Sequence, residues 1–247
     1  MISFNSEQRF IVTGASSGIG EATALLLNEL GASVIGIGRN QERLNAMKAK
    51  AKHPENIFLE QKDLAEDIDG LPAYVKSLKD KYGKFSGMAY CAGIGGIISL
   101  QSMDVKTVKH TFDVNYLSAL FLTKGFADRR VNIGKGASVV AIASIAANVA
   151  EKGQIAYAGS KAALITSMKT ISHELSSQHI RVNTISPSTV ETPMLKDGSP
   201  DYFQEMAGNY PFGFGKPADV ANMTAFLLSD KAAWITGQNY VLDCGAY

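Results

Sequence analysis

Short apolar runs along the chain alternate with stretches in which apolar residues recur every three or four positions. The short runs are typical of buried strands, and the periodic stretches are typical of helices with one packed face. Seven runs predict strands: Arg9 to Thr13, Ser33 to Ile37, Ile57 to Glu60, Gly87 to Tyr90, Ser138 to Ala143, Arg181 to Ser186 and Asn239 to Leu242. The alternation predicts an α/β fold, a doubly wound seven-stranded parallel sheet with helices on both faces, in one domain over residues 1–247.

The first predicted strand ends in a glycine-rich turn. Val12-Thr13 is followed by glycines at positions 14, 18 and 20, and apolar residues then recur at helical spacing as far as Leu30. Glycines let the backbone approach a ligand closely, and the free N–H groups at a helix start favour a phosphate. The turn therefore predicts a pyrophosphate site. Its Gly-x3-Gly-x-Gly spacing differs from Gly-x-Gly-x-x-Gly, so an ordinary glycine-rich loop is the alternative.

Composition narrows the partner to a small molecule. The chain has 24 Lys and Arg residues against 23 Asp and Glu, so we expect no surface for nucleic acid or an anionic membrane. The apolar runs are too short to span a membrane, and the first residues do not resemble a signal peptide. Cys91, Cys244 and four scattered histidines show neither a disulfide pattern nor metal-ligand spacing. We therefore expect a cytoplasmic protein without a metal site.

Residues just after each strand are the candidates for ligand contact, because doubly wound sheets bind ligands at the carboxyl ends of their strands. Arg39 stands at about the distance where NAD-binding folds carry an acid for the ribose 2′-OH. Its guanidinium suits a 2′-phosphate, to which Ser16 could also donate, which favours NADP(H) over NAD(H). A solvated surface arginine is the alternative. Asp63 is a candidate acceptor for an adenine amino group, and Ala92-Gly93 would let the backbone pass close to a cofactor.

A long helix is predicted from Asp104 to Phe126, with Asn115 in its middle. Asparagine is unfavourable inside a helix because its amide competes for backbone hydrogen bonds. Asn115 therefore either caps an interrupted turn, which is a structural role, or holds a polar group such as water near a ligand site. The pattern alone does not separate the two.

Ser144, Tyr157 and Lys161 form a candidate catalytic set. Ser144 follows the fifth predicted strand, and Tyr157 opens Tyr-Ala-Gly-Ser-Lys161 on a helix predicted to run to about Ser177. Positions i and i+4 share a helical face, so we expect the Lys161 ammonium to lie near the Tyr157 phenol. A nearby cation favours phenolate and would lower the pKa of Tyr157 toward the range useful for proton transfer. An ordinary surface pair is the alternative.

These residues, in this order and spacing, resemble the short-chain dehydrogenases/reductases of the classical kind. The resemblance rests on Thr13-Gly14-x3-Gly18-Ile19-Gly20, Ser144 and Tyr157-x3-Lys161, and it covers essentially the whole chain. It implies a single-domain Rossmann fold in which Tyr157 is the general acid or base. It also implies that Lys161 lowers the pKa of Tyr157 and binds the nicotinamide ribose, and that Ser144 positions and polarises the substrate carbonyl.

The resemblance implies further roles around this set. Asn115 matches the asparagine that holds a water in the proton relay, Asp63 the adenine-site acid, and Arg39 the arginine of NADP-preferring members. The segment from Pro187 to Thr192 is expected to contact the nicotinamide amide and phosphate. The cofactor-binding residues expected in all are Gly14, Ser16, Ser17, Gly18, Ile19, Gly20, Arg39, Asp63, Leu64, Ala92, Gly93, Tyr157, Lys161, Pro187, Val190 and Thr192.

The chain departs from the family pattern at the end of the fourth strand. Members usually carry Asn-Asn-Ala-Gly where this chain has Tyr90-Cys91-Ala92-Gly93, so a contact made by the second asparagine is absent. Ala92 and Gly93 still match, so we expect cofactor binding with altered local support. We expect Cys91 to be a small packed residue, not a reactive thiol. Ser188 replaces a usual glycine, which is a milder departure.

A substrate lid is expected over about residues 193–216. The segment is rich in aromatic and Met residues, among them Tyr202, Phe203, Met206 and Tyr210, which indicates an apolar wall. A packed surface helix or a subunit contact would show the same composition. In related proteins the end of the chain contributes to tetramer contacts, so a homotetramer or homodimer is expected.

Within the family the chain is similar to 3-oxoacyl-[acyl-carrier-protein] reductases, which implies NADP(H)-dependent reduction of a 3-oxoacyl thioester. Such reductases carry two arginines near the site mouth, and their places here fall near Lys135 and His173, which weakens the carrier-protein version. A sugar, polyol or steroid-type alcohol dehydrogenase is the alternative. A non-catalytic NADP-binding sensor is a third reading, against which Ser144, Tyr157 and Lys161 argue. The two enzyme readings expect a small carbonyl or alcohol substrate.

Overall fold

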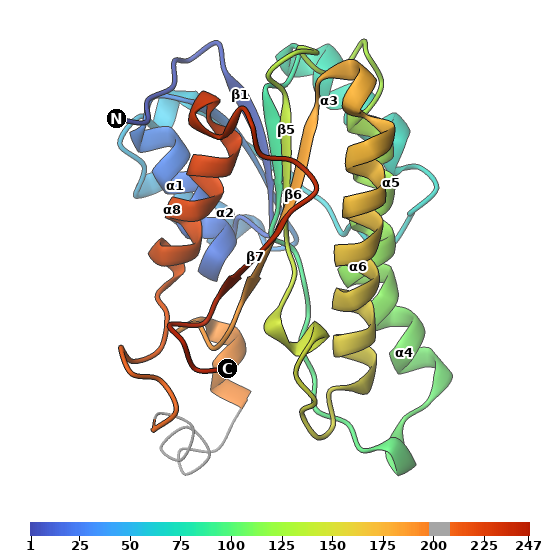
Figure 1. The fold of residues 1–247 in the computed structure, drawn as a ribbon. Coiled ribbons are helices and arrows are strands. Elements are labelled where there is room, and N and C mark those ends of the chain that lie inside the picture. The colour runs from blue at the N-terminus through green and yellow to red at the C-terminus, as the bar shows by residue number, and fades with distance from the viewer. Residues whose placement is uncertain (198–207) are drawn as a thin grey trace.

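Strands and helices alternate along the chain, as the hydrophobic pattern predicts (Figure 1). The computed structural model describes residues 1–197 and 208–247. Its strands are β1 (Arg9–Thr13), β2 (Ser33–Gly38), β3 (Ile57–Gln61), β4 (Gly87–Tyr90), β5 (Ser138–Ile142), β6 (Arg181–Pro187) and β7 (Asn239–Leu242). The α-helices of the described residues are α1 (Gly18–Glu29), α2 (Gln41–Ala49), α3 (Leu71–Tyr82), α4 (Val105–Phe112), α5 (Ser118–Phe126), α6 (Ile155–Glu174) and α8 (Pro217–Leu228). Every predicted strand is found, with its ends within one residue of the prediction.

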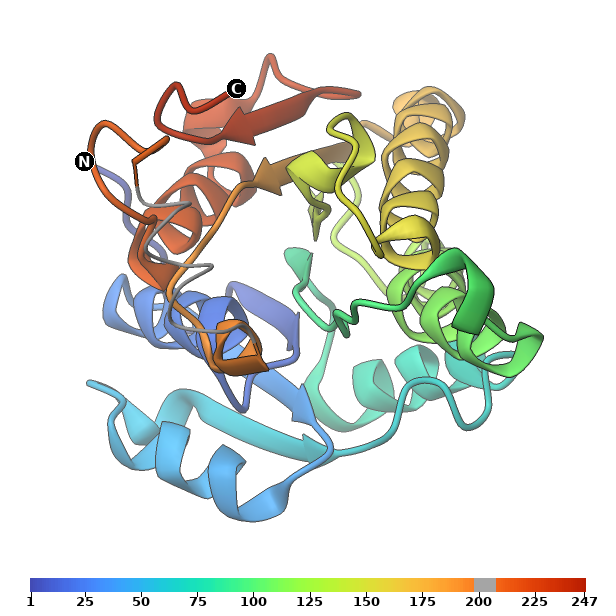
Figure 2. The same cartoon turned by 90° about the horizontal axis from the view of Figure 1, so that it is seen from below.

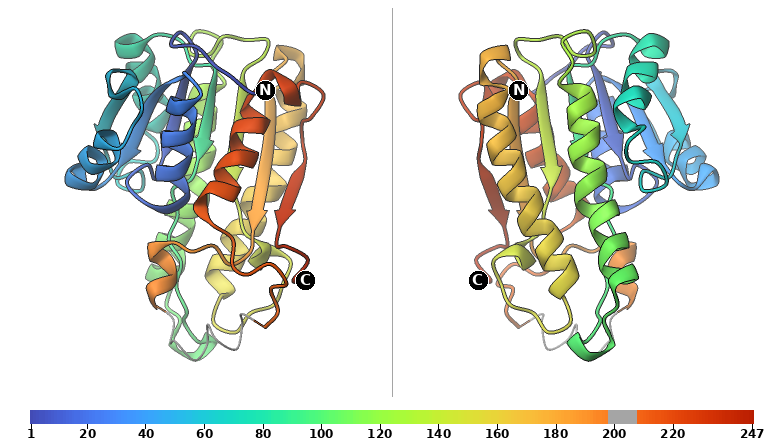
Figure 3. Two further views of the ribbon diagram at one scale, coloured as in Figure 1. Left: turned by 90° about the vertical axis from the view of Figure 1, so that its left-hand side faces the viewer. Right: turned by 90° about the vertical axis from the view of Figure 1, so that its right-hand side faces the viewer.

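The seven strands pair in parallel in the order β3-β2-β1-β4-β5-β6-β7. Helices α1, α2 and α8 cover one face of the sheet, and α3, α5 and α6 cover the other (Figures 1 and 3). The strand order changes direction between β1 and β4, and ligands of doubly wound sheets bind at such a point. The predicted fold class is confirmed.

Two apolar layers hold the helices to the sheet. Successive strand residues point to opposite faces, so Ile11 packs into the layer under α3, α5 and α6, whereas Val12 packs into the layer under α1 and α8. The strands read as almost continuous apolar runs because both faces are buried. Leu27 of α1 and Leu228 of α8 share the second layer, where these two helices lie side by side.

The helix predicted from Asp104 to Phe126 is continuous but not uniform. A π-helical turn, Asp113–Leu117, separates α4 from α5, and Asn115 lies inside this turn. Wider turns of this kind are frequent at functional sites. The interrupted turn, one of the two alternatives for Asn115, is therefore present.

The loops that follow the strands extend past the carboxyl end of the sheet, which faces the viewer in Figure 2. They include the segments 91–104, 143–154 and 188–197. The predicted lid spans about residues 193–216. Residues 198–207 of this segment, which include Tyr202, Phe203 and Met206, lie outside the described residues. No helix of the described chain is long and apolar enough to cross a membrane.

Candidate active site

The glycine turn between β1 and α1 keeps the backbone clear of side chains. Gly14 has a φ of 66°, and a Cβ there would lie 3.0 Å from the backbone of Ala92. A Cβ on Gly20 would lie 2.2 Å from the Gly14 carbonyl oxygen. Ser17 begins α1 without a side-chain cap, so the first N–H groups of the helix are left for another acceptor. Gly18, Ile19 and Gly20 line a cleft of about 690 Å³, which suits a phosphate at this helix start.

Strand β4 ends beside the glycine turn. The Thr13 hydroxyl oxygen accepts hydrogen bonds of 3.0 Å from the N–H groups of both Cys91 and Ala92. Thr13 therefore supplies local support at the point where the family's second asparagine is missing. Burial raises the pKa of Cys91 to about 12, which keeps its sulfur a neutral thiol. Gly93 is tightly placed, because a Cβ there would lie 3.3 Å from Asn115 Oδ1 and 3.4 Å from Lys161 Nζ.

Positive charge gathers in the cleft beyond β2. Arg39 Nη1 lies 3.9 Å from an oxygen of Asp63, and both side chains are open to solvent. Arg43 and Lys62 line the same part of the cleft. Asn40 begins α2 and accepts a 2.8 Å hydrogen bond from the Arg43 N–H. Three cations and one carboxylate line the cleft with the start of α2 among them, which favours an anionic ligand group.

Ser144 and Tyr157 face the cleft from neighbouring elements. Ser144 lies two residues past β5 and accepts a 3.2 Å hydrogen bond from the Ala146 N–H, while Tyr157 is in the first turn of α6. Burial raises the pKa of Tyr157, and its hydrogen bond with Ser144 opposes the rise. The expectation that Lys161 lowers this pKa is therefore corrected. The Lys161 ammonium lies 5.8 Å from the centre of the phenol ring and donates to a backbone carbonyl instead.

Lys161 is a buried cation at the floor of the cleft. Its side chain is 4% exposed, and Nζ donates a 2.8 Å hydrogen bond to the Ile142 carbonyl oxygen at the end of β5. Among the described residues it forms no ion pair. Burial lowers its pKa to about 8, with a small opposing effect from Cys91. An ammonium has three donors, so two of them remain for other partners at the cleft.

Asn115 is fully buried behind the cleft wall, and its side-chain amide is engaged with protein groups. Oδ1 accepts a 2.8 Å hydrogen bond from the Ile94 N–H, while Nδ2 donates to the Ile94 carbonyl at 3.0 Å and to Ser160 Oγ at 3.1 Å. Ser160 Oγ in turn donates to the Tyr157 carbonyl at 2.7 Å. The side chain of Asn115 therefore fixes the loop after β4 against α6. Of its two alternatives, the structural role is the one that the amide contacts favour.

The segment after β6 closes the cleft on the side of the glycine turn. Val190 forms an isolated β-bridge with Gly215. A Cβ on Gly18 would lie 3.2 Å from Thr192 Cγ2, so Thr192 packs directly on the turn. Pro187, Val190 and Thr192 all line the cleft.

Tyr210, from the described part of the predicted lid, is anchored to this segment. Its hydroxyl lies 2.7 Å from Ser188 Oγ and 2.8 Å from Thr189 Oγ1, and its ring packs edge-on against Phe214. Tyr210 is buried and lines the cleft. Ser188 therefore gives the Tyr210 hydroxyl a hydrogen-bond partner that the glycine usual at this position could not provide.

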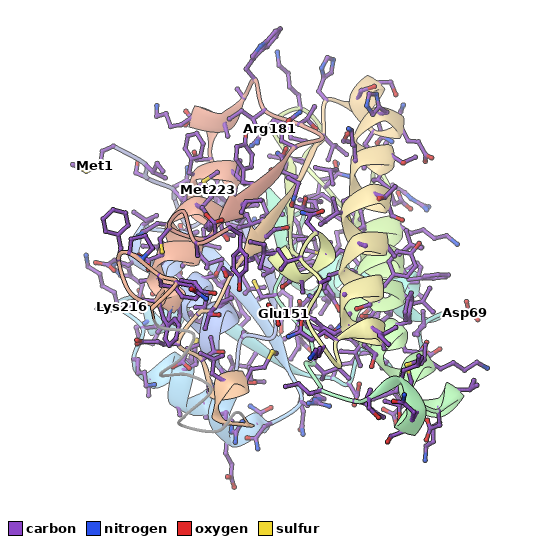
Figure 4. The ribbon with its side chains drawn as sticks, turned by 60° about the horizontal axis from the view of Figure 1, so that its bottom comes forward. Met1, Asp69, Glu151, Arg181, Lys216 and Met223 are labelled. Atoms are coloured by element: carbon purple, nitrogen blue, oxygen red, sulfur yellow. The ribbon has the colours of Figure 1, made fainter. Side chains whose placement is uncertain are left out.

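The cleft continues past Tyr157 to a wall of mixed character. Ile94, Ile145, Val149, Met194 and Leu195 supply apolar surface. Glu151 and Gln154 supply polar groups, and the described residues offer neither side chain a hydrogen-bond partner. Figure 4 shows Glu151 near the start of α6, at the carboxyl end of the sheet.

Lys135 and His173 lie at the other end of the molecule. Lys135 stands three residues before the start of β5, and His173 is in the last turn of α6, so both belong to the amino end of the sheet. The expectation that these two residues lie near the mouth of the site is therefore wrong for a single copy of the chain. No group of three or more His, Cys, Asp or Glu residues in the described chain could hold a metal ion.

One cleft brings together almost every residue singled out from the sequence. All the expected cofactor-binding residues line it, and so does Ser144; Asn115 lies just behind its wall. Sequence reasoning missed Arg43, Lys62, Glu151 and Gln154. Arg43 stands four residues after Arg39 at a helix start and Lys62 is next to Asp63, so spacing alone offered a signal for these two.

Comparison with known proteins places the chain in a family. A family model described as Enoyl-(Acyl carrier protein) reductase matches residues 14–247. The 3-oxoacyl-[acyl-carrier-protein] reductase FabG of Thermotoga maritima is 32% identical over 95% of this chain and 96% of its own length. The L-rhamnose 1-dehydrogenase (NAD(P)(+)) of Sphingomonas sp. is also 32% identical, over 96% of this chain and 95% of its own length.

A solved structure agrees with these matches. A short chain dehydrogenase from Burkholderia cenocepacia J2315, in complex with NADP, superposes with a TM-score of 0.89 at 28% identity and covers 98% of each chain. The glycine turn, the Ser144, Tyr157 and Lys161 arrangement and the extent of these matches agree with one another. The chain belongs to the short-chain dehydrogenase/reductase family of oxidoreductases.

Proposed function

We propose that the protein is an NADP(H)-dependent oxidoreductase that interconverts a ketone and a secondary alcohol, with Tyr157 as general acid or base. The observation that carries the proposal is the convergence of Ser144, Tyr157 and Lys161 on one cleft that also contains the glycine turn. In the reductive direction Tyr157 donates its proton to the carbonyl oxygen, and Ser144 hydrogen-bonds that oxygen as charge develops. Lys161, with water, resupplies the proton. NADPH, when bound, supplies the hydride.

The protonation state of Tyr157 fits this direction. Burial raises the pKa of its phenol, so the group holds its proton at neutral pH and is ready to act as an acid. Lys161, with a pKa of about 8, changes charge close to neutral pH and is suited to accept and return a proton. The oxidative direction would need the phenolate form of Tyr157, which burial disfavours.

The cofactor groups have matching protein surfaces. The side-chain-free glycine turn suits the pyrophosphate, and Lys161 suits the nicotinamide ribose. Arg39, Arg43 and Lys62 favour the extra phosphate of NADP(H) over NAD(H), and Asp63 is the candidate acceptor for the adenine amino group. The relative solved with NADP supports the same choice.

For the substrate we propose a 3-oxoacyl thioester. The apolar wall of Ile94, Ile145, Val149 and Leu195 suits an acyl chain, and the FabG relative of Thermotoga maritima carries that activity in its name. A sugar or polyol is the second candidate, because the Glu151 carboxylate and Gln154 amide, which have no partner among the described residues, suit hydroxyl groups, and Glu151 would repel an anionic carrier. The L-rhamnose 1-dehydrogenase relative supports it.

We further propose that residues 1–247 act as one domain, with 193–216 as the substrate lid, in a cytoplasmic homotetramer or homodimer. Two unpaired cysteines suit a reducing compartment. Trp234 is wholly exposed and Val241 is 45% exposed, which favours a subunit contact at this edge of the sheet. Tyr210 supports the lid, since it ties residues beyond position 207 to the cleft.

The test is NADPH oxidation with a panel of carbonyl compounds: a 3-oxoacyl thioester, small ketones, keto-sugars and a ketosteroid. Turnover confined to the thioester is the expected result. Turnover of a keto-sugar instead would move the protein to the sugar and polyol class. Tight NADPH binding without turnover of any member would favour a non-catalytic sensor over both.

A further inference from the structure

Strand β4 ends in a tyrosine whose hydroxyl group bonds only to protein groups among the described residues. Tyr90 is completely buried, and its hydroxyl contacts both the Val114 carbonyl oxygen and, at 2.5 Å, the hydroxyl of Ser118. Ser118 Oγ also lies 2.8 Å from the same carbonyl. Each hydroxyl has one proton to give, so one hydroxyl donates to the other and the second donates to the carbonyl. The three oxygens form a closed cluster.

The cluster sits on the π-helical turn. Val114 is the second residue of Asp113–Leu117, and Ser118 is the first residue after it. Wide turns of this type are less regularly hydrogen-bonded than an α-helix, so their carbonyls rely more on side chains. Tyr90 reaches across from the sheet to one of these carbonyls and ties the turn to the end of β4.

The next residue of the turn connects the cluster to the active site. Asn115 holds the Ile94 backbone through two hydrogen bonds and reaches Ser160, which bonds the Tyr157 carbonyl. Val114 and Ile94 themselves line the cleft. A small shift of the turn would therefore move the cleft wall and the start of α6 together.

We propose that Tyr90 is a positioning residue: its hydroxyl, together with Ser118, holds the π-helical turn in the register that places Asn115, Ile94 and, through Ser160, Tyr157. The proposal rests on the proposed function for its effect on turnover, because only then does Tyr157 move a proton. The structural part of the proposal, that the Tyr90 hydroxyl helps to hold the Ile94 backbone in place, does not depend on any reaction.

The ring and the hydroxyl of Tyr90 have separable roles. A buried aromatic ring at this position would pack the core equally well as phenylalanine. Only the hydroxyl reaches Val114. Tyr90→Phe therefore removes the proposed role and keeps the packing, and Tyr82→Phe is the matched control, because Tyr82 gives its hydroxyl to Glu60 at 2.7 Å, away from the cleft.

The experiment measures kcat, KM, the dissociation constant of NADPH and Tm for wild type, Tyr90→Phe, Ser118→Ala, the double variant and Tyr82→Phe. We expect Tyr90→Phe to lower kcat about tenfold, with KM and NADPH affinity within twofold, because orientation of the acid and not binding is lost. Ser118→Ala should act in the same direction, and the double variant should be no worse than the poorer single one, because the two hydroxyls act as one unit. A Tyr90→Phe kcat equal to that of Tyr82→Phe would overturn the proposal.

Hydrogen exchange separates this proposal from the proposed function. The Ile94 N–H is held by Asn115, whereas the Ala92 N–H is held by Thr13 and serves as the internal reference. We expect Tyr90→Phe to speed exchange at Ile94 at least fivefold relative to Ala92. If wild type turns over no substrate, the proposed function fails while this ratio still decides the role of Tyr90. Unchanged Ile94 exchange, with kcat falling only as the folded fraction falls, would assign Tyr90 to stability alone and overturn the proposal.

Discussion

Each end of the sheet contains a buried cation, and the two cations differ in how many hydrogen bonds they donate to the protein. At the amino end, Arg181 is 8% exposed and donates to two carbonyl oxygens, Leu227 at 2.6 Å and Ser229 at 3.0 Å (Figure 4). At the carboxyl end, Lys161 is 4% exposed and donates to one, Ile142. Neither belongs to an ion pair among the described residues.

The difference separates a charge that stabilises the fold from one that we propose takes part in catalysis. Arg181 donates from its fixed fork to one carbonyl in the last turn of α8 and to that of the capping residue Ser229, where a positive charge also complements the helix dipole. Lys161 keeps two donors free, next to Tyr157 and an open cleft. A buried charge with unused donors costs stability and is expected where a ligand completes its coordination.

The largest effect is expected from Lys161→Met. Removing the ammonium should lower kcat/KM by roughly 10³-fold, because proton transfer through Tyr157 loses its partner. The free energy of unfolding, measured with urea at pH 7, should stay within about 1 kcal/mol of wild type or rise, since an incompletely paired buried charge is removed. Activity within tenfold of wild type would contradict the functional role.

Arg181→Met should show the opposite profile. We expect the free energy of unfolding to fall by about 2 kcal/mol and Tm by roughly 4–8 °C, because charge-assisted hydrogen bonds to two carbonyls are lost. The kcat of the folded protein should stay within twofold. Lys231→Met is the control, because Lys231 is an exposed cation near the same end, 3.6 Å from Asp230. A loss of kcat without a loss of stability would break the comparison.

Arg39→Asp tests a third, exposed cation. Arg39 is 63% exposed, and its ion pair with Asp63 is long, at 3.9 Å, and open to solvent. Its removal should therefore change the free energy of unfolding by less than about 0.5 kcal/mol. The ratio of NADPH to NADH affinity should fall by at least about tenfold, because a charge-assisted contact to the 2′-phosphate is replaced by repulsion. An unchanged ratio would transfer that role to Arg43 and Lys62, which Arg43→Asp would then show.

The last expected effect is a pH slope, which is gradual. Burial lowers the pKa of Lys161 to about 8 from its ordinary value of 10.5. Between these values the unfolded chain binds a proton that the folded chain has lost, so the free energy of unfolding gains a contribution that rises with pH. Relative to Lys161→Met, wild type should gain up to about 1.4 kcal/mol per pH unit between roughly pH 8 and 10, measured by urea unfolding. A difference that does not change with pH would contradict this.

The sheet and the gathering of the candidate residues could be predicted from the sequence because both follow from local patterns. Apolar runs and turn residues locate the strands, and parallel strands bring their carboxyl ends to one edge. Arg39, Ala92, Ser144 and Val190 stand just after four different strands, so the fold alone collects them in one cleft.

The properties that failed to follow from the sequence depend on contacts between distant elements. The i, i+4 spacing placed Lys161 near Tyr157 correctly, but the direction of the Tyr157 pKa is decided by burial, which spacing does not report. The bond from Tyr90 to Val114 joins residues 24 positions apart and needs the π-helical turn to be known first. The end of the sheet at which Lys135 lies follows only once the chain direction at β5 is known.

The central claim, that the cleft at the carboxyl end is a hydride-transfer site with Tyr157 as its acid, is tested most directly by Tyr157→Phe. Turnover with the best substrate of the panel and the dissociation constant of NADPH are measured side by side. The account predicts a kcat lower by at least about 10³-fold with NADPH affinity within threefold, because only the acidic proton is removed. Turnover close to that of wild type would contradict it.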